Sequence, residues 1–265
     1  MSNASALTIS NLQAMKQSGE KITMLTCYDA TFAAEMDQAG VDIILVGDSL
    51  GMVVQGRSST VGVSVDEIAY HTQCVAAGVE RTFLLADMPF GSYHDEAVAM
   101  ENAVALLSAG GAMVKLEGAG PMIPIVEYLT SRGVPVCAHL GLTPQSVNQL
   151  GGFKVQAREE AEAQALLEDA GAMQRAGAQM LVVECVPAAL GKALSGSLDI
   201  PVIGIGAGAD CDGQVLVMHD MLGLGNWRPK FVANFMQGSE SILSAFEKYV
   251  ADVRCGKFPT PEHEY

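Results

Sequence analysis

Short runs of Val, Ile, Leu and Met recur along the chain, separated by segments in which apolar residues return every three to four positions. The runs have the length of buried strands, and the segments between them have the period of amphipathic helices. We predict eight strands, the last on a weaker pattern than the others, at 21–27, 41–47, 81–86, 112–117, 134–140, 179–184, 200–206 and 229–235.

Helical spacing is clearest at 65–78, 95–111 and 157–178, and several of these segments are closed by the glycine expected at a helix C-terminus. A strand followed by a helix, repeated eight times, predicts an α/β fold of the (β/α)8 TIM-barrel type. An open doubly wound sheet is the main alternative. We expect residues 1–265 to form one barrel domain with an N-terminal helical extension around Ile9 to Gln17, because no linker or low-complexity segment interrupts the pattern.

The composition agrees with a buried parallel sheet. The chain has 265 residues, of which 49% are hydrophobic and 17% are charged. This size is typical of one α/β barrel, and the low charge content suits strands that are covered on both faces.

The formal net charge is −15. A surface of this charge repels phosphate backbones and anionic bilayers, so we expect neither nucleic acid nor a membrane as a partner. The six cysteines are scattered without a CxxC pair, which favours reduced thiols in a cytoplasmic protein. The first residues lack the pattern of a signal peptide, and no apolar run reaches the ~18 residues of a membrane span.

Four predicted strands end in a carboxylate: Asp48, Asp87, Glu117 and Glu184. In a barrel these ends meet at one rim, which is the face where active sites lie. A single acidic residue at a strand end usually caps a helix or a turn, and that alternative stands for each of the four taken alone. Four together favour a functional rim.

The electrostatic energy indicates what this rim needs. Neighbouring strands lie ~4.8 Å apart, so inward carboxylates on three adjacent strands would approach within ~5 Å. Each such pair costs ~3 kcal/mol at an effective dielectric constant of ~20. The acids therefore take up protons, point apart, or surround a cation, and an all-oxygen ligand set favours Mg²⁺ or another hard divalent ion over zinc.

Three further residues are candidates for the same rim. Lys115 stands two positions before Glu117, so both side chains face the barrel interior, where Lys115 would pair with an acid or with an anionic substrate. His139 ends another strand and is a candidate for catalysis or for structural hydrogen bonding. Ser49 follows Asp48 and offers a hydroxyl group, with helix capping as its alternative role. Glu184, two strands beyond the three-acid group, is a candidate for proton transfer, with a salt bridge or a helix cap as the alternative.

Long motifs extend across 21–235 and read MLTCYDATFA, VGDSLGMVVQGRSSTVGVSVDEIAYHT, LLADMPFGSY, VKLEG, AHLGLTPQSVNQLGGFKVQ, LVVECVP, IPVIGIGAG and PKFVANF. Together they resemble the ketopantoate hydroxymethyltransferase family. The resemblance implies a (β/α)8 barrel enzyme of pantothenate and coenzyme A biosynthesis that assembles into a large homo-oligomer, which we expect to be a decamer. It implies transfer of a hydroxymethyl group from 5,10-methylenetetrahydrofolate to 3-methyl-2-oxobutanoate, which forms 2-dehydropantoate and tetrahydrofolate by way of a Mg²⁺-stabilised enolate.

The resemblance also implies roles for individual residues. The metal ligands would be Asp48, Asp87 and Glu117. Ser49 and Lys115 would hold the oxoacid, with Asp48 and Asp87 bordering it. Glu184 would be the general base, and His139 would lie beside the substrate as a second catalytic residue.

Two other functions fit part of the pattern. The first is a Mg²⁺-dependent enzyme of the phosphoenolpyruvate mutase and isocitrate lyase type, which breaks or rearranges C–C or C–P bonds in 2-oxoacids. The second is a barrel that binds a metabolite without catalysis. Dependence of product formation on folate separates the first from the transferase, and chemistry at C3 of the oxoacid separates the second.

Overall fold

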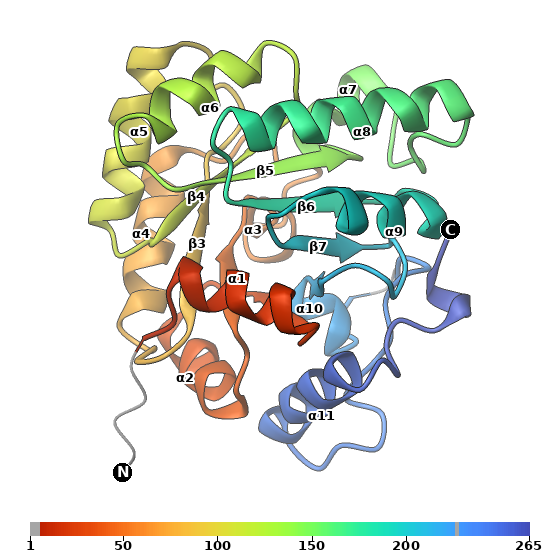
Figure 1. The fold of residues 1–265 in the computed structure, drawn as a ribbon. Helices are drawn as coiled ribbons and strands as arrows, with labels where there is room; N and C mark the ends of the chain where they lie inside the picture. Colours follow the sequence, from red (N-terminus) through yellow and green to blue (C-terminus); the bar gives the residue numbers. More distant parts are fainter. Residues whose placement is uncertain (1–5, 226–227) are drawn as a thin grey trace.

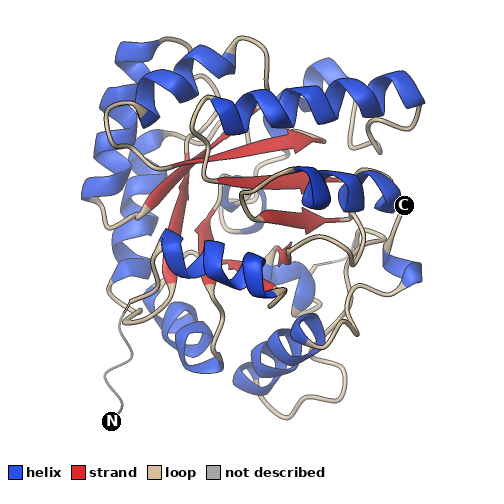
Figure 2. Cartoon of the chain, viewed as in Figure 1, coloured by secondary structure: helices blue, strands red, loops and turns tan. Residues whose placement is uncertain are grey.

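Eight parallel strands form a closed barrel in which each strand pairs with its neighbours along the chain and β8 pairs with β1. The structure is a computed structural model that describes residues 6–225 and 228–265. Figure 2 shows the strands enclosed by helices. The strands are β1 (Ile22–Thr26), β2 (Ile43–Val46), β3 (Phe83–Asp87), β4 (Met113–Glu117), β5 (Val136–Gly141), β6 (Met180–Glu184), β7 (Val202–Ile205) and β8 (Gly213–Leu216). The predicted TIM barrel is confirmed.

The helices cover the outside of this barrel, and α4, α5, α6 and α8 follow one another along one side (Figure 1). The helices are α1 (Ile9–Ser18), α2 (Ala30–Ala39), α3 (Leu50–Val53), α4 (Val65–Ala76), α5 (Glu96–Ser108), α6 (Met122–Thr130), α7 (Val147–Leu150), α8 (Glu160–Arg175), α9 (Ala188–Ser197), α10 (Met218–Met221) and α11 (Ile242–Arg254), with short 3-10 turns η1 (Pro144–Ser146) and η2 (Pro261–His263). No helix of the described residues is both long and apolar enough to cross a bilayer.

Local sequence explains where the main helices begin. Asp29 and Asp95 accept hydrogen bonds from backbone N–H groups in the first turns of α2 and α5. Ser64 and Glu67 form a reciprocal capping box at the start of α4. Because these caps come directly after rim loops, they set the point at which each loop returns to the outer layer.

The core has two layers. One apolar cluster fills the barrel interior below the rim, and a larger one lies between the strands and the surrounding helices. The predicted N-terminal helix is confirmed as α1. Its Leu12 is fully buried against the interior cluster, and Lys16 forms an ion pair with Asp212 just before β8. The N-terminal helix therefore packs against the end of the barrel at which the strands begin.

The prediction of the eighth strand was wrong. Residues 229–235 form turns at the rim, and the eighth strand is β8. Residues 206–212 join β7 to β8 without a helix, so the strand–helix alternation also fails at this step. The sequence pattern did not indicate this strand because it begins with Gly213 and Gln214 rather than with an apolar run. Glycine is required at 213, since a Cβ there would lie 2.4 Å from the carbonyl oxygen of Ile22.

Tyr249 connects α11 to the seam that closes the barrel. Its ring is fully buried, and its hydroxyl group donates toward the carbonyl oxygens of Gln214 on β8 at 2.8 Å and of Met24 on β1 at 3.0 Å. The hydroxyl therefore bridges the first and last strands.

We expect Tyr249→Phe to lower the free energy of unfolding by about 1–2 kcal/mol, because it removes a buried hydrogen bond at the seam between β1 and β8. Urea unfolding followed by circular dichroism measures the change. Tyr70→Phe is the matched control, since the Tyr70 ring is 63% exposed and its replacement changes the stability little. Equal effects of the two substitutions would contradict the bridging role.

Candidate active site

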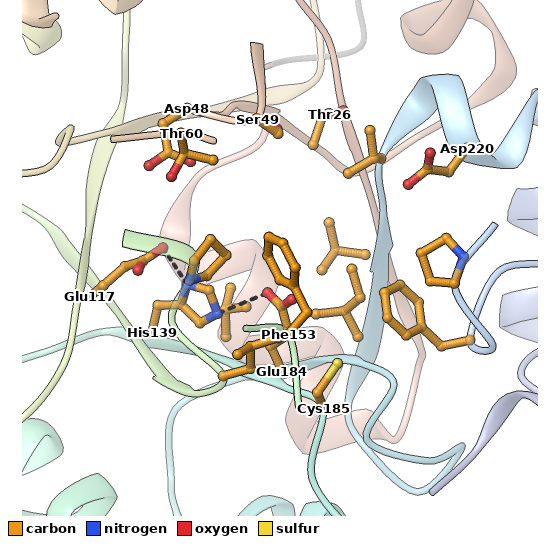
Figure 3. A pocket seen from close by; sticks show the side chains of 18 of the residues that line it. Thr26, Asp48, Ser49, Thr60, Glu117, His139, Phe153, Glu184, Cys185 and Asp220 are labelled. Carbon is orange, nitrogen blue, oxygen red and sulfur yellow. Dashed lines mark ion pairs between the residues drawn. The ribbon is translucent and has the colours of Figure 1, made fainter. Parts of the chain in front are cut away.

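A cavity of about 630 Å³ opens at the C-terminal ends of the strands. All the residues predicted for the rim line it, together with apolar side chains from the loops above (Figure 3). The predicted residues are Asp48, Ser49, Asp87, Lys115, Glu117, His139 and Glu184. The strand ends thus converge as the barrel geometry requires.

The strand register places these side chains at matching heights. Asp87 pairs with Lys115 across β3 and β4, and Glu117 pairs with His139 across β4 and β5. Since Lys115 and Glu117 lie two positions apart on one strand, both side chains project into the barrel, as expected. The register alone therefore brings opposite charges into contact.

Lys115 is the central cation of the site. Its Nζ lies 2.6 Å from Oδ1 of Asp87 and 3.8 Å from Oε1 of Glu117, and all three side chains are buried. Burial alone would lower the pKa of Lys115, but Asp87, Glu117 and Asp48 together raise it. The lysine is therefore a fixed positive charge that neutralises part of the acidic rim.

The three neighbouring acids differ in their response to burial. Burial, and then the charges of Asp87 and Glu117, raise the pKa of Asp48 well above its ordinary value. Burial also raises the pKa of Asp87, against the opposing effect of Lys115. For Glu117 the effect of burial is outweighed by His139 and Lys115, which lower its pKa. One lysine and one histidine thus leave part of the negative charge uncompensated.

His139 bridges two carboxylates. Its Nδ1 lies 3.2 Å from Oε1 of Glu117 and its Nε2 lies 3.3 Å from Oε2 of Glu184, the two ion pairs drawn in Figure 3. Burial and the nearby Lys115 lower the pKa of the imidazole, but the carboxylates outweigh them and raise it to about 9. His139 is therefore protonated at neutral pH and holds Glu184 toward the acid cluster.

Glu184 is the most accessible acid of the group. Its side chain is 14% exposed, compared with 2% for Glu117. The next residue, Cys185, has a φ of 49°, a left-handed conformation that is unfavourable for a residue with a side chain. The sharp turn at Cys185 ends the strand and leaves the Glu184 carboxylate at the cavity wall.

None of the four acids caps the helix that follows its own strand, and Ser49 makes no such bond either, so that alternative is wrong. The residues before α3, α5, α6 and α9 are Ser49, Asp95, Pro121 and Pro187, and Ser49 makes no side-chain capping bond. Instead, Ser49 Oγ lies 2.8 Å from the hydroxyl group of Tyr28. For Lys115, the sequence left open whether its partner is an acid or an anionic substrate. In the structure its ammonium group pairs with the acid Asp87.

Sequence reasoning missed a layer of residues that supports the acids. Gln145 donates through Nε2 to Oδ2 of Asp48 at 2.9 Å, and its backbone N–H donates to Oε2 of Glu117 at 2.9 Å. Tyr93 donates to the side-chain oxygen of Gln145. Thr60, also missed, lines the cavity with a buried hydroxyl that has no hydrogen-bond partner among the described residues. The family motifs quoted above contain these residues but assign them no role, because each stands alone in a loop or a short turn and no strand end or helical period singles it out.

The acid cluster offers oxygen ligands but is not assembled around a cation. Within residues 6–225 and 228–265 no three His, Cys, Asp or Glu side chains converge as a metal site. Oδ1 of Asp87 and Oε1 of Glu117 are nevertheless buried, and each faces one cationic side chain, Lys115 at 2.6 Å and His139 at 3.2 Å. Three buried carboxyl groups with one lysine and one histidine between them, in which crowding raises the pKa of Asp48, form an oxygen-rich set that fits a hard divalent cation.

Comparison with known proteins decides the family. The family model described as ketopantoate hydroxymethyltransferase matches residues 6–261. The chain belongs to this family. Two relatives named 3-methyl-2-oxobutanoate hydroxymethyltransferase illustrate the match. The one from Thiobacillus denitrificans is 56% identical over 260 residues, which cover 98% of this chain and 99% of the relative, and the one from Burkholderia multivorans is 55% identical over 265 residues, which cover 100% and 98%.

Solved structures show the same fold at low identity. The phosphoenolpyruvate phosphomutase of Streptomyces platensis subsp. rosaceus superposes with a TM-score of 0.62 at 14% identity, over 82% of this chain and 83% of that one. A phosphonopyruvate hydrolase solved with oxalate and Mg²⁺ gives 0.61 at 14% identity, over 79% and 80%. At this identity the two structures show the fold alone, and membership of the ketopantoate hydroxymethyltransferase family makes this chain a transferase.

We expect Lys115→Met to destabilise the protein by about 3 kcal/mol, because it leaves buried Asp87 without its cation. Lys192→Met is the matched control, since Lys192 and its partner Asp210 are 70% and 62% exposed and the substitution changes the stability by less than about 1 kcal/mol. Urea unfolding of both variants tests this. A Lys115 variant as stable as the control would show that Asp87 does not depend on the lysine.

Proposed function

We propose that this protein transfers a hydroxymethyl group from 5,10-methylenetetrahydrofolate to 3-methyl-2-oxobutanoate and forms 2-dehydropantoate and tetrahydrofolate. The observation that carries the proposal is the rim cluster in which His139 contacts accessible Glu184 beside buried Lys115, in a chain of this family. The oxoacid is an anion with a weakly acidic C–H group. The site combines a fixed cation with a carboxylate base, which is what removal of that proton requires.

The proposed ligands of Mg²⁺ are Asp48, Asp87 and Glu117, whose buried oxygens suit a hard cation. When bound there, the cation would neutralise the negative charge that grows on the oxoacid as its C3 proton leaves. Lys115 contributes a second positive charge, and Ser49, with Tyr28 fixing its hydroxyl group, would orient the substrate.

Glu184 would take the proton from C3, so that the C–H electron pair remains on the oxoacid as an enolate. His139 positions the Glu184 carboxylate through the ion pair at 3.3 Å. A C–C bond then forms between C3 and the methylene carbon, whose bonds to the folate nitrogens break. Water supplies the hydroxyl group of the product, and the folate nitrogens regain their protons.

The proposal extends to the state of the protein. Self-association into a large homo-oligomer, a decamer, follows from the family resemblance, and exposed apolar side chains such as Tyr70 and Phe90 support contacts between copies. A cytoplasmic location is supported by the cysteines, all of which are free. We also propose that residues 1–265 form a single barrel domain that functions as one unit.

We expect the protein to exchange the C3 proton of 3-methyl-2-oxobutanoate for deuterium in D₂O without folate, and to lose this activity when divalent metal is stripped. Glu184→Gln should cut the exchange rate by ~10² or more, because the amide cannot accept the proton. Proton NMR measures the exchange, and calorimetry should show oxoacid affinity within about threefold of the wild type.

Glu247→Gln is the matched control for this experiment, because Glu247 is exposed on α11. Exchange that survives in the Glu184 variant, or a loss of oxoacid affinity equal to the loss of rate, would remove Glu184 from the role of base. Absence of exchange in the metal-loaded wild type would count against enolisation before folate binds.

We expect Gln145→Ala to weaken Mg²⁺ binding by about 10–100-fold, because Asp48 loses the amide that orients its carboxylate. Isothermal titration calorimetry with Mg²⁺ measures the change. Gln164→Ala on the exposed face of α8 is the control. Unchanged affinity in the Gln145 variant would show that Asp48 needs no such support.

A further inference from the structure

The catalytic cavity extends well beyond the acid cluster. Its volume of about 630 Å³ lies in the ~300–1,000 Å³ range of pockets that hold much larger ligands than a small branched oxoacid. Three aromatic side chains line this outer part, Phe153, Phe231 and Tyr265. Residues 264 and 265 return to the rim, where the backbone N–H of Ala188 donates to the carbonyl oxygen of Tyr265 at 3.0 Å.

Asp220 is an unpaired acid in this outer part. It lies on α10 and lines the cavity on the side opposite the Glu117 carboxylate (Figure 3). Its carboxylate makes no hydrogen bond and no ion pair with any residue that the structure describes. Burial raises its pKa to about 6, against the opposing effect of Arg228, so it is mostly ionised at neutral pH. A half-buried carboxylate without a donor is a ready acceptor for a ligand.

Two cations lie elsewhere around the same cavity. Lys154 and Arg158 line it from the segment between α7 and α8, and neither forms an ion pair within the described ranges. Both side chains are exposed at the mouth. In a chain of net charge −15, two unpaired cations at the cavity opening favour an anionic group there.

This distribution of charge matches a reduced folate. One edge of the pterin carries an N3–H and a 2-amino group side by side, which pair with the two oxygens of a carboxylate. The pterin ring is flat and suits aromatic walls. The other end of the molecule carries the carboxylates of the glutamate tail.

We propose that Asp220 accepts hydrogen bonds from the N3–H and 2-amino group of the folate pterin, while Lys154 and Arg158 receive the glutamate tail. This inference rests on the proposed function and assigns the folate subsite within it. In this orientation the carbon between N5 and N10 lies between the two ends of the folate. That carbon would face Glu184 and the oxoacid, where the C–C bond forms.

Asp220→Asn tests the pterin contact, because the amide offers one acceptor where the carboxylate offers two. We expect KM for 5,10-methylenetetrahydrofolate to rise about 10-fold or more, with a smaller change in kcat. The C3 exchange without folate reports whether the oxoacid half of the site is intact in each variant. Asp210→Asn is the matched control, since Asp210 is an exposed acid that does not line the cavity.

A folate analogue without the 2-amino group separates recognition from a structural effect. The wild type should lose affinity for this analogue, whereas Asp220→Asn, which already lacks the contact, should lose little more. Asp220→Ser serves in the same way if the Asn variant does not fold. Replacing Lys154 and Arg158 by Gln should raise KM for the folate but leave unchanged KM for a methylene-tetrahydropterin without the tail.

The outcomes distinguish the two proposals. Wild-type C3 exchange with no folate-dependent product would overturn the proposed function and this subsite with it. Normal product formation by the wild type, with equal KM for Asp220→Asn and Asp210→Asn, would overturn the subsite alone. An equal penalty for the 2-desamino analogue in wild type and variant would do the same.

Discussion

The balance of charge at the barrel rim is the constraint on which the rest of this structure depends. Asp48, Asp87 and Glu117 are buried side by side, and a fold of ordinary stability does not tolerate three unneutralised carboxylates at such distances. Lys115, on the same strand as Glu117, offsets part of this charge, and His139 on β5 offsets more. The remaining negative charge favours binding of a cation. The same buried carboxylates that destabilise the fold would therefore hold the metal ion of the proposed reaction.

The strand pairing of the barrel fixes the level of each side chain along the barrel axis as well as the direction in which the side chain points. Parallel register sets Asp87 against Lys115 and Glu117 against His139, so the ion pairs form between strands rather than between mobile loops. Glu184 lies on β6, the strand after that of His139, and the ion pair with His139 links its carboxylate to the acid cluster. The site therefore has a rigid inner part for a small anion and an outer part built from loops, which suits two substrates of very different size.

The sequence was sufficient for the barrel and for placing seven residues around the rim cavity, because both follow from strand periodicity and strand ends. It failed at β8, where close backbone contact demands Gly213 and a buried Gln214 replaces the apolar run. It also failed at Gln145, Tyr93, Thr60 and Asp220. These residues reach the site from loops and short helices, and their positions depend on how distant segments fold back, which no local pattern records.

The connection between β7 and β8 has a consequence for how this barrel can change. Residues 206–212 replace a whole crossover helix, and α9 packs so closely over them that a Cβ at Gly191 would lie 2.0 Å from the carbonyl oxygen of Ala207. The contact at Gly191 leaves no room for an added side chain. An insertion into 206–212 would therefore push α9 away from the barrel wall, so this connection is a poor place to lengthen the chain.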